Sequence, residues 1–446
     1  MKKIRLSPIE KVKTAVIAVL TVTMLALAAF YIGGSQFYTG GAAINSGEMP
    51  SGAVAAGENA PNLKSVYEQG LLRASFAGIR FDEHGGGSYS TEPAANNLLD
   101  FSLDGIHTLL SYSAKISQSS KEDFEAATDG GRFICISLIS PLPYQIIYAL
   151  SGEYVAPASY ENAISADTLM IVFDRNCNAS LYMRDGEKYY VSFGEYTYDD
   201  AELAVMASDS RLYGFEIANG IPISETSPLA QTISVKSPEL CSYDELALLL
   251  DALEYTGNET VTLATTESYS IVAPHGVLSA SSDRILYTAE NEGGIPISSF
   301  HGSSKSELDI DINDILLASV SLAQKICKTF EQSTYNMYLD GFYHGDDTYT
   351  IVFGATEDGI PLSGEKYPHL VRLTVSGGRF KSIDTRLILI EKSGLPFSPF
   401  SSAWEYRHAA KSASVSSIGL RYNIDEIPLT EQNAAWYYTG ERQGAR

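Results

Sequence analysis

The chain has 446 residues, with 31 Lys and Arg against 54 Asp and Glu, for a formal net charge of -23. Apolar residues make up 45% and charged residues 19%. This composition excludes an acidic disordered chain as the main description, because it provides enough apolar side chains for large cores. The length indicates two or three domains of roughly 100–200 residues each. The acidity disfavours a nucleic-acid partner, which needs clustered Lys and Arg.

The charge is unevenly distributed along the chain. Residues 1–13 carry a net +4, which leaves -27 for the remainder. The uncharged run 14–32 follows at once, and as a helix it would span roughly 28 Å, close to the hydrocarbon thickness of a bilayer. The pattern predicts a cytoplasmic basic segment (1–13) and a single transmembrane anchor (14–33), with the rest of the chain extracytoplasmic.

A cleaved signal peptide is the alternative for this segment. Ala26-Leu27-Ala28 matches a small-residue cleavage site, and a basic start followed by an apolar run is also the order of a signal peptide. Signal-peptide apolar regions usually have about 7–15 residues, and the run here is longer. Tyr31 also suits a membrane interface. We therefore favour an uncleaved anchor.

The exterior part divides by composition into a linker and two larger regions. Residues 34–62 are dominated by Gly, Ala and Ser without apolar periodicity, which is typical of a flexible linker. We expect an α+β domain at 63–240 and a pair of α+β units at 241–446. Four cysteines are far apart and form no CxxC motif, so we expect buried free thiols at Cys135 and Cys327.

Helix start signals precede several of the expected helices. Ser242 and Glu245 form a capping-box pattern, as do Ser402 and Glu405, and Thr197 with Asp200 is a looser match. The clearest helix is expected at 314–331, where apolar residues recur at intervals of three and four.

Short strands rich in β-branched and aromatic residues are expected between the helices. They lie at 169–173, 189–193, 261–264, 268–272, 285–288, 349–353, 370–375 and 387–390. The short connections at Asp185-Gly186 and Gly377-Gly378 predict antiparallel pairing.

A pentapeptide occurs three times in the exterior part. It reads GIPIS at 220–224 and 294–298 and GIPLS at 359–363. Gly permits unusual backbone angles and Pro fixes φ, so each copy predicts a turn that leads into a strand. Each copy also follows a helix and one or more strands. We infer repeated small units, each an antiparallel sheet packed on one helix.

No catalytic motif is evident in the sequence. The acidic run 307–314 fits a strand leading into a helix N-terminus better than a cation site. The groups 344–347 and 82–84 fit turns, and His107 fits packing on a helix face. The sequence therefore predicts no catalytic residue, metal site or cofactor, although residues that meet only in space would leave no local motif.

The C-terminal half resembles the YycH/YycI family of membrane-anchored regulators of Gram-positive bacteria. The features that carry the resemblance run in order along 241–446. They are the helix 314–331, the segments 349–353, 359–362 and 370–375, Gly377-Gly378, the segment 380–383, the helix 403–410, and the segments 418–422 and 434–437. The resemblance implies cystatin-like or PepSY-like units.

The same resemblance implies a non-enzymatic accessory role. Such proteins bind a WalK-type sensor histidine kinase, and a paralogous regulator, in the control of cell-wall homeostasis. Thr21, Thr23, Ala26 and Ala28 are small or hydroxylic residues that would let a partner helix approach closely. Ordinary anchor residues are the alternative explanation for these four.

Two other functions stay open at the level of sequence. An extracytoplasmic protein that binds a ligand or a cell-wall polymer would use aromatic residues on one sheet face for stacking on sugars. A secreted hydrolase would gather His and carboxylate residues from distant segments into one pocket.

Overall fold

The computed structural model describes sixteen segments of the exterior part. They are residues 70–111, 116–152, 164–209, 211–218, 220–224, 229–238, 242–253, 261–265, 268–290, 293–301, 310–329, 336–345, 347–364, 367–397, 415–425 and 429–440. All of them belong to the compact unit 59–446. The expected cytoplasmic segment, anchor and linker lie outside the described residues, as do Thr21, Thr23, Ala26 and Ala28. Within the described segments, no helix has the length and apolar character needed to span a membrane.

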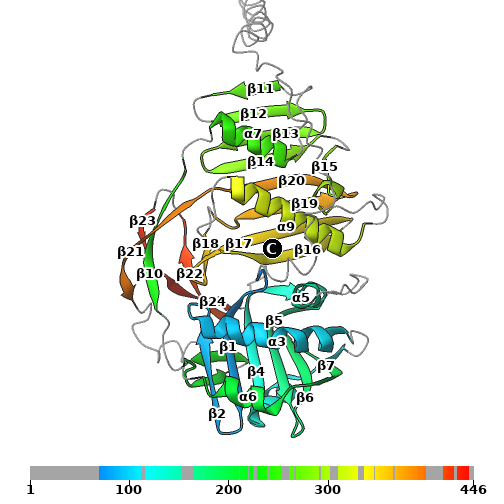
Figure 1. Cartoon of the computed structure of the whole chain (residues 1–446), viewed down its shortest axis with the longest axis vertical. Coiled ribbons are helices and arrows are strands. Elements are labelled where there is room, and N and C mark those ends of the chain that lie inside the picture. The colour runs from blue at the N-terminus through cyan, green and yellow to red at the C-terminus, as the bar shows by residue number, and fades with distance from the viewer. Residues whose placement is uncertain are drawn as a thin grey trace, which may run out of the picture. The chain divides into compact units, whose positions relative to one another are not determined.

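The described chain is α+β with mostly antiparallel sheets, as the sequence predicts. The first sheet has seven antiparallel strands in the order β2-β1-β4-β5-β6-β7-β3 (Figure 1). These are β1 (Ala74–Phe81), β2 (His84–Tyr89), β3 (Ile116–Ser119), β4 (Arg132–Pro143), β5 (Ser165–Phe173), β6 (Asn178–Asp185) and β7 (Lys188–Thr197). Its helices are α3 (Pro93–Ser111), α4 (Lys121–Asp129), α5 (Tyr144–Ser151) and α6 (Asp200–Ala207).

Both faces of the first sheet are buried. Ile134 and Ile136 of β4 belong to the large core that includes α3, whereas Phe133 and Cys135 face a second cluster. That cluster includes Phe124 of α4 and residues of the hairpin formed by β8 (Phe215–Ala218) and β9 (Ile221–Ser224). Burial on both sides explains why β4 reads as a continuous apolar run instead of alternating.

The second sheet has twelve strands and is built from distant parts of the chain. Its members are β11 (Val261–Ala264), β12 (Ser268–Ala273), β13 (Gly276–Ser281), β14 (Arg284–Ala289), β15 (Ile295–Pro296), β16 (Asn336–Gly345), β17 (Thr348–Glu357), β18 (Ile360–Ser363), β19 (Val371–Ser376), β20 (Arg379–Arg386), β22 (Val415–Asn423) and β24 (Ala435–Gly440). The β18–β22 pair is parallel. A separate three-stranded sheet joins β10 (Ala230–Lys236) to β21 (Leu389–Phe397) and β23 (Leu429–Gln432).

A helix followed by four antiparallel strands occurs twice in this region. Helix α7 (Tyr243–Ala252) precedes β11 to β14, and α9 (Ile312–Thr329) precedes β16, β17, β19 and β20. The last strands of the two groups, β14 and β20, pair antiparallel and join them into one sheet. In Figure 1, α7 and α9 lie over the same face of that sheet. The short helix α8 (Ser298–His301) packs against α9.

The three pentapeptides are turns that lead into strands, as predicted. Gly220, Gly294 and Gly359 have φ of 75°, 129° and 77°, where Gly is favoured over other residues. The strands β9, β15 and β18 begin directly after them. The copies do not occupy equivalent places in repeated units. The second follows the fourth strand of its group, whereas the third lies between the second and third strands of its own group.

Several boundaries confirm or correct the sequence predictions. Ser242 and Glu245 form the expected capping box, and α9 begins two residues before the predicted start. The looser match at Thr197 is wrong, because Asp199 caps α6 by accepting from the N–H groups of Ala201 and Glu202. The strand predicted at 387–390 begins instead at Leu389. The helix predicted at 403–410 lies outside the described residues.

Candidate functional site

The twelve-stranded sheet has one face that α7 and α9 cover and another with partly exposed side chains. A fully buried row crosses it on the covered side. This row is formed by Ile271, Leu278, Tyr287, Ile383, Leu373 and Ile351, which are aligned in register. Because side chains alternate between the two faces of a strand, the residues between these point to the opposite face.

We define the open face as the twelve side chains of two rows on that opposite side. The first row is Ser270, Ser279, Leu286, Asp384, Arg372 and Val352, and the second is Val272, Val277, Thr288, Ser382, Thr374 and Thr350. None of the twelve is buried. Six strands at ~4.8 Å spacing make this face about 24 Å wide. Six of the twelve carry hydroxyl groups, so the face presents many hydrogen-bond donors and acceptors.

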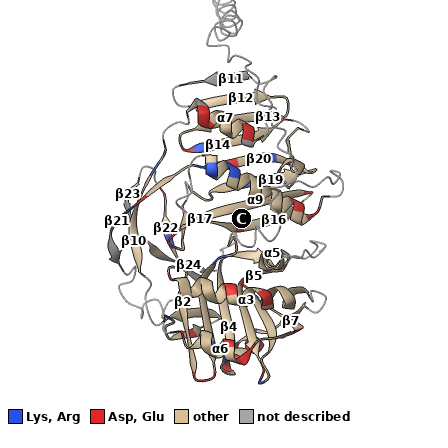
Figure 2. Cartoon of the chain, in the orientation of Figure 1, with Lys and Arg blue, Asp and Glu red and all other residues tan. Residues whose placement is uncertain are grey.

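Three arginines gather at one edge of the open face, and we call them the arginine patch. Arg372 lies directly opposite Asp384, and Arg284 lies directly opposite Arg386. Figure 2 marks basic residues on β14, whereas acidic residues lie on α3 and α7. With Asp384 as the carboxylate among them, the patch carries a net +2 from these four side chains, in a chain of net charge -23.

Asp384 organises the arginine patch. Its carboxylate accepts hydrogen bonds from Arg284 Nε at 2.8 Å and Nη2 at 2.9 Å. His369 Nε2 lies 3.2 Å from Oδ2 of Asp384, the oxygen that also accepts from Arg284 Nη2, and the His369 side chain is 7% exposed. Burial alone would raise the pKa of Asp384, but the contacts with His369 and Arg284 outweigh it and hold that pKa well below its usual range. The carboxylate therefore stays ionised and keeps Arg284 in place.

Two arginines of the patch have no such partner. Arg372 is exposed, and its guanidinium makes no hydrogen bond or ion pair within the described segments. Arg386 Nε is shielded from solvent and has no hydrogen-bond partner there. A planar guanidinium binds a carboxylate or phosphate through two parallel hydrogen bonds. The patch is therefore chemically suited to an anionic group that arrives from outside the chain.

The motifs singled out in the sequence form turns and packing contacts. His344 and Gly345 end β16, Asp347 comes directly before β17, and the ring of His344 lies 4.5 Å from that of Tyr349. His107 stacks on Tyr148 with ring centroids 4.2 Å apart. Asp311 accepts from the N–H groups of Asn313 and Asp314 and caps the start of α9. The described part of the acidic run thus has the helix-capping role that was predicted.

The group 82–84 likewise forms the turn between β1 and β2, and Asp82 there pairs with Arg132. Among the described residues, no group of three or more His, Cys, Asp or Glu is placed to hold a metal ion. The arginine patch was not found from sequence. Its signal was weak, because the alternation in 371–376 predicts an exposed Arg372 but not which strand lies beside it.

Comparisons with family models, with curated proteins and with solved structures find no match to this chain.

Proposed function

We propose that the chain is a membrane-anchored, extracytoplasmic accessory protein that binds a sensor histidine kinase and regulates it without catalysing a reaction. The proposal keeps the single anchor at 14–33 with a cytoplasmic N-terminus. It also keeps Thr21, Thr23, Ala26 and Ala28 as contacts for a partner helix. We further propose that the two groups of one helix and four strands are cystatin-like or PepSY-like units, which agrees with the YycH/YycI resemblance.

The observation that best supports this proposal is the arginine patch on an open sheet face. Two of its guanidinium groups lack partners in the described residues, and it is a basic site on an acidic chain. Electrostatic complementarity speeds the encounter of two proteins and selects between partners. We propose that an acidic segment of the exterior domain of the kinase binds there.

The same face disfavours the alternative of a sugar polymer stacked on aromatic rings. The twelve open-face residues include no aromatic side chain, and the second row continues into β16 with one exposed ring, Tyr343, opposite Thr350. That alternative depends on several aromatic residues on one sheet face that stack on sugar rings. A protein partner that brings carboxylates fits the chemistry of the patch better.

The proposal is tested by co-purification from membranes. The tagged full-length chain is expressed with the candidate kinase, solubilised in mild detergent and captured. We expect the kinase to be captured, and the double variant R372A/R386A to reduce the amount severalfold. The matched control is K121A/K188A, which removes the same charge from the region of the first sheet.

Two results would contradict the proposal. The first is equal capture of the kinase by wild type and by R372A/R386A. The second is unchanged kinase output both when Leu replaces Thr21, Thr23, Ala26 and Ala28 and when residues 63–446 are deleted.

A further inference from the structure

A polar cleft lies where the start of α3 meets the turn between β17 and β18. Ser90 Oγ donates a hydrogen bond to the carbonyl of Gly359 at 2.7 Å, across 269 positions of sequence. A Cβ atom on Gly359 would lie 2.0 Å from the carbonyl oxygen of Ser90, so only glycine allows this approach. The cleft beside this contact has a volume of about 270 Å³.

The two walls of the cleft come from distant parts of the chain. Arg73, Thr91, Asn96 and Asn97 line one side, and Asp358 with Gly359 lines the other. A smaller pocket of about 20 Å³ adjoins it and is lined by Pro222 and Pro361 of two pentapeptide copies. The repeated turns therefore help to build the walls of this region.

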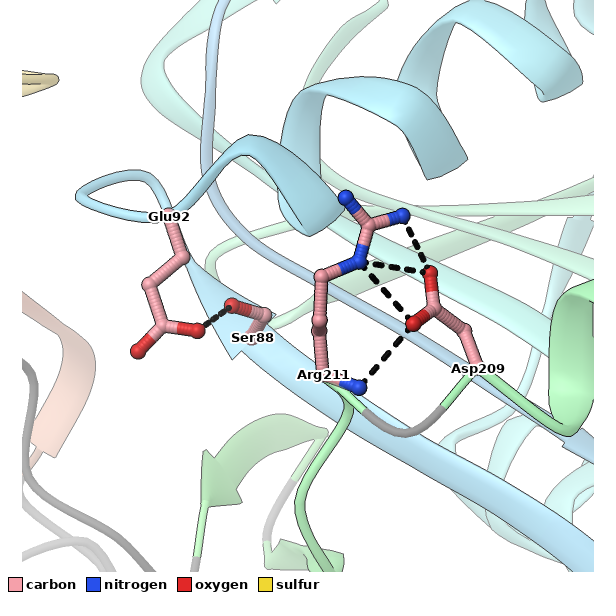
Figure 3. A network of polar contacts seen from close by, with 4 residues as sticks. All are labelled: Ser88, Glu92, Asp209 and Arg211. Carbon is pink, nitrogen blue, oxygen red and sulfur yellow. Dashed lines mark hydrogen bonds and ion pairs between the residues drawn. The ribbon is translucent and has the colours of Figure 1, made fainter.

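The acidic groups of the cleft already have partners. Glu92 accepts a hydrogen bond from Ser88 Oγ at 3.2 Å, and Asp358 pairs with Lys392 Nζ at 2.7 Å. Figure 3 shows Glu92 directed to Ser88, whereas nearby Arg211 is directed to Asp209 and not to Glu92. Neither carboxylate of the cleft pairs with Arg73, and the acidic group whose charge acts on Arg73 is Asp100.

The donor groups of the cleft lack partners. Arg73 Nε and Thr91 Oγ1 are shielded from solvent and have no hydrogen-bond partner in the described residues. The side-chain amides of Asn96 and Asn97 make no hydrogen bond there either. Burial lowers the pKa of Arg73, and the charge of Asp100 opposes this shift. Because the ordinary pKa of arginine is far above neutral pH, the side chain stays positively charged. Shielded donors without acceptors are unfavourable. Arg73 and Thr91 are only partly buried and line the cleft, so a group bound there would lie beside these donors.

We propose that this cleft binds a small molecule that carries a carboxylate, with Arg73 and Thr91 as donors to the carboxylate oxygens and Asn96 and Asn97 at its mouth. The volume lies just below that of drug-sized sites and is suited to a molecule such as an acylated amino acid or a short peptide. This site is separate from the arginine patch, and it adds a small ligand to a protein proposed to bind another protein.

The test compares two probes of nearly the same size and shape, one with a carboxylate and one with a neutral carboxamide. Binding of N-acetylglycine and of the neutral N-acetylglycinamide to the full-length chain in detergent is measured by titration calorimetry and by thermal shift, up to 50 mM. We expect saturable binding of the acid and at least tenfold weaker binding of the amide. We expect R73Q to weaken binding of the acid about tenfold or more, because hydrogen bonds to charged groups are the strong ones.

Two further variants and one control complete the test. N97D places a negative charge at an exposed position of the mouth, so it should weaken binding of the acid without affecting folding. T91V removes the hydroxyl and keeps the shape, and a severalfold loss is expected. R372Q, on the open face, should bind as wild type does. The proposal is overturned if the acid shows no saturable binding, if acid and amide bind equally, or if both R73Q and N97D bind like wild type.

Discussion

Arg284 and Arg386 lie directly opposite each other on β14 and β20, and the carboxylate of Asp384 hydrogen-bonds to Arg284. Arg386 Nε has no hydrogen-bond partner in the described part of the chain. Like charges directly opposite each other in an antiparallel pair are destabilising. The strand pair that joins the two helix-and-strand groups therefore contains one satisfied arginine and one that is unfavourable for stability.

The two arginines should respond differently to the same substitution. R386Q removes the repulsion, so we expect the free energy of unfolding to stay equal or to rise by about 0.5 kcal/mol. R284Q removes the same repulsion but also both hydrogen bonds from Arg284 to Asp384, and we expect a net loss of about 1.5 kcal/mol. Urea unfolding of the two variants measures the difference. A larger loss for R386Q than for R284Q would show that the assignment of partners is wrong.

Asp384 should make stability depend on pH at the acid end. Its folded-state pKa is lowered, so its contribution is present above the unfolded pKa of about 3.9 and is lost as the pH falls through the folded value. We expect D384N to lose about 3 kcal/mol at pH 7, and the deficit to shrink below about pH 4.

A matched control exists in the first sheet. Asp82 accepts two hydrogen bonds from Arg132, at 2.6 and 2.8 Å, but its side chain is 53% exposed. D82N should therefore lose much less stability than D384N, because water screens an exposed pair. Equal losses for the two variants in urea unfolding would contradict the role of burial.

Asp340 should give the opposite dependence on pH. Burial raises its pKa, although Ser140 and Tyr338 donate hydrogen bonds to it and the charge of His369 opposes the shift. A raised carboxyl pKa means that the stabilisation is present below the unfolded value of about 3.9 and is lost as the pH rises through the folded value. We expect D340N to gain on the order of 1 kcal/mol relative to wild type between pH 4 and pH 7.

The donor to Asp340 provides the control for this prediction. S140A removes a hydrogen bond that favours the ionised form, so the stability of this variant should fall more steeply with pH than that of wild type. Unfolding in urea at several pH values measures both slopes. A stability of D340N that keeps a constant offset from wild type across this range would refute the prediction.

Alanine substitutions at two glycines with positive φ should distinguish the cost of backbone strain from the cost of a steric clash with Ser90. Gly359 has φ +77° and its added Cβ would meet Ser90, whereas Gly377 has φ +55° and open space around it. We expect G377A to cost about 1 kcal/mol from strain alone. G359A should cost clearly more and should loosen the contact with Ser90. Thermal unfolding compares the two variants, and equal costs would mean that the close approach is not important for stability.

The elements of the fold were more predictable from sequence than its assembly. Local chemistry set the helix capped by Ser242, the turn at Gly377-Gly378 and the positive φ of Gly359, because each depends on neighbouring residues only. The pairing of β14 with β20 depends on residues about 100 positions apart, and no local signal specifies it. Similar short strands would have supported several other orders.

The candidate sites were missed for the same reason. Arg284, Arg372 and Asp384 come together only when β14, β20 and β19 lie side by side. The contact of Ser90 with Gly359 joins positions that are 269 residues apart in the sequence. Sequence reasoning did locate the pentapeptide at Gly359, but it interpreted the repeat as a mark of equivalent units. In the structure, two copies instead line one small pocket.

The cysteines give a chemical test of the cores. Cys135, Cys177 and Cys327 are free thiols, as predicted for the first and the third, and burial raises the pKa of Cys135 and of Cys327 to about 12. Only about one thiol in ten thousand at such a pKa is ionised at pH 8, and the thiolate is the reactive form. Burial also raises the pKa of Cys177, as does its hydrogen bond to Asp200.

Labelling with Ellman's reagent at pH 8 measures this protection. The variant C241S is used, because Cys241 lies outside the described residues. We expect no fast labelling of the native variant and labelling of the three remaining thiols in denaturant. Fast stoichiometric labelling of the native protein that C135S abolishes would show that the second apolar cluster is open to solvent. Slow labelling that follows the rate of unfolding agrees with closed cores, because reaction then waits for the thiols to become exposed.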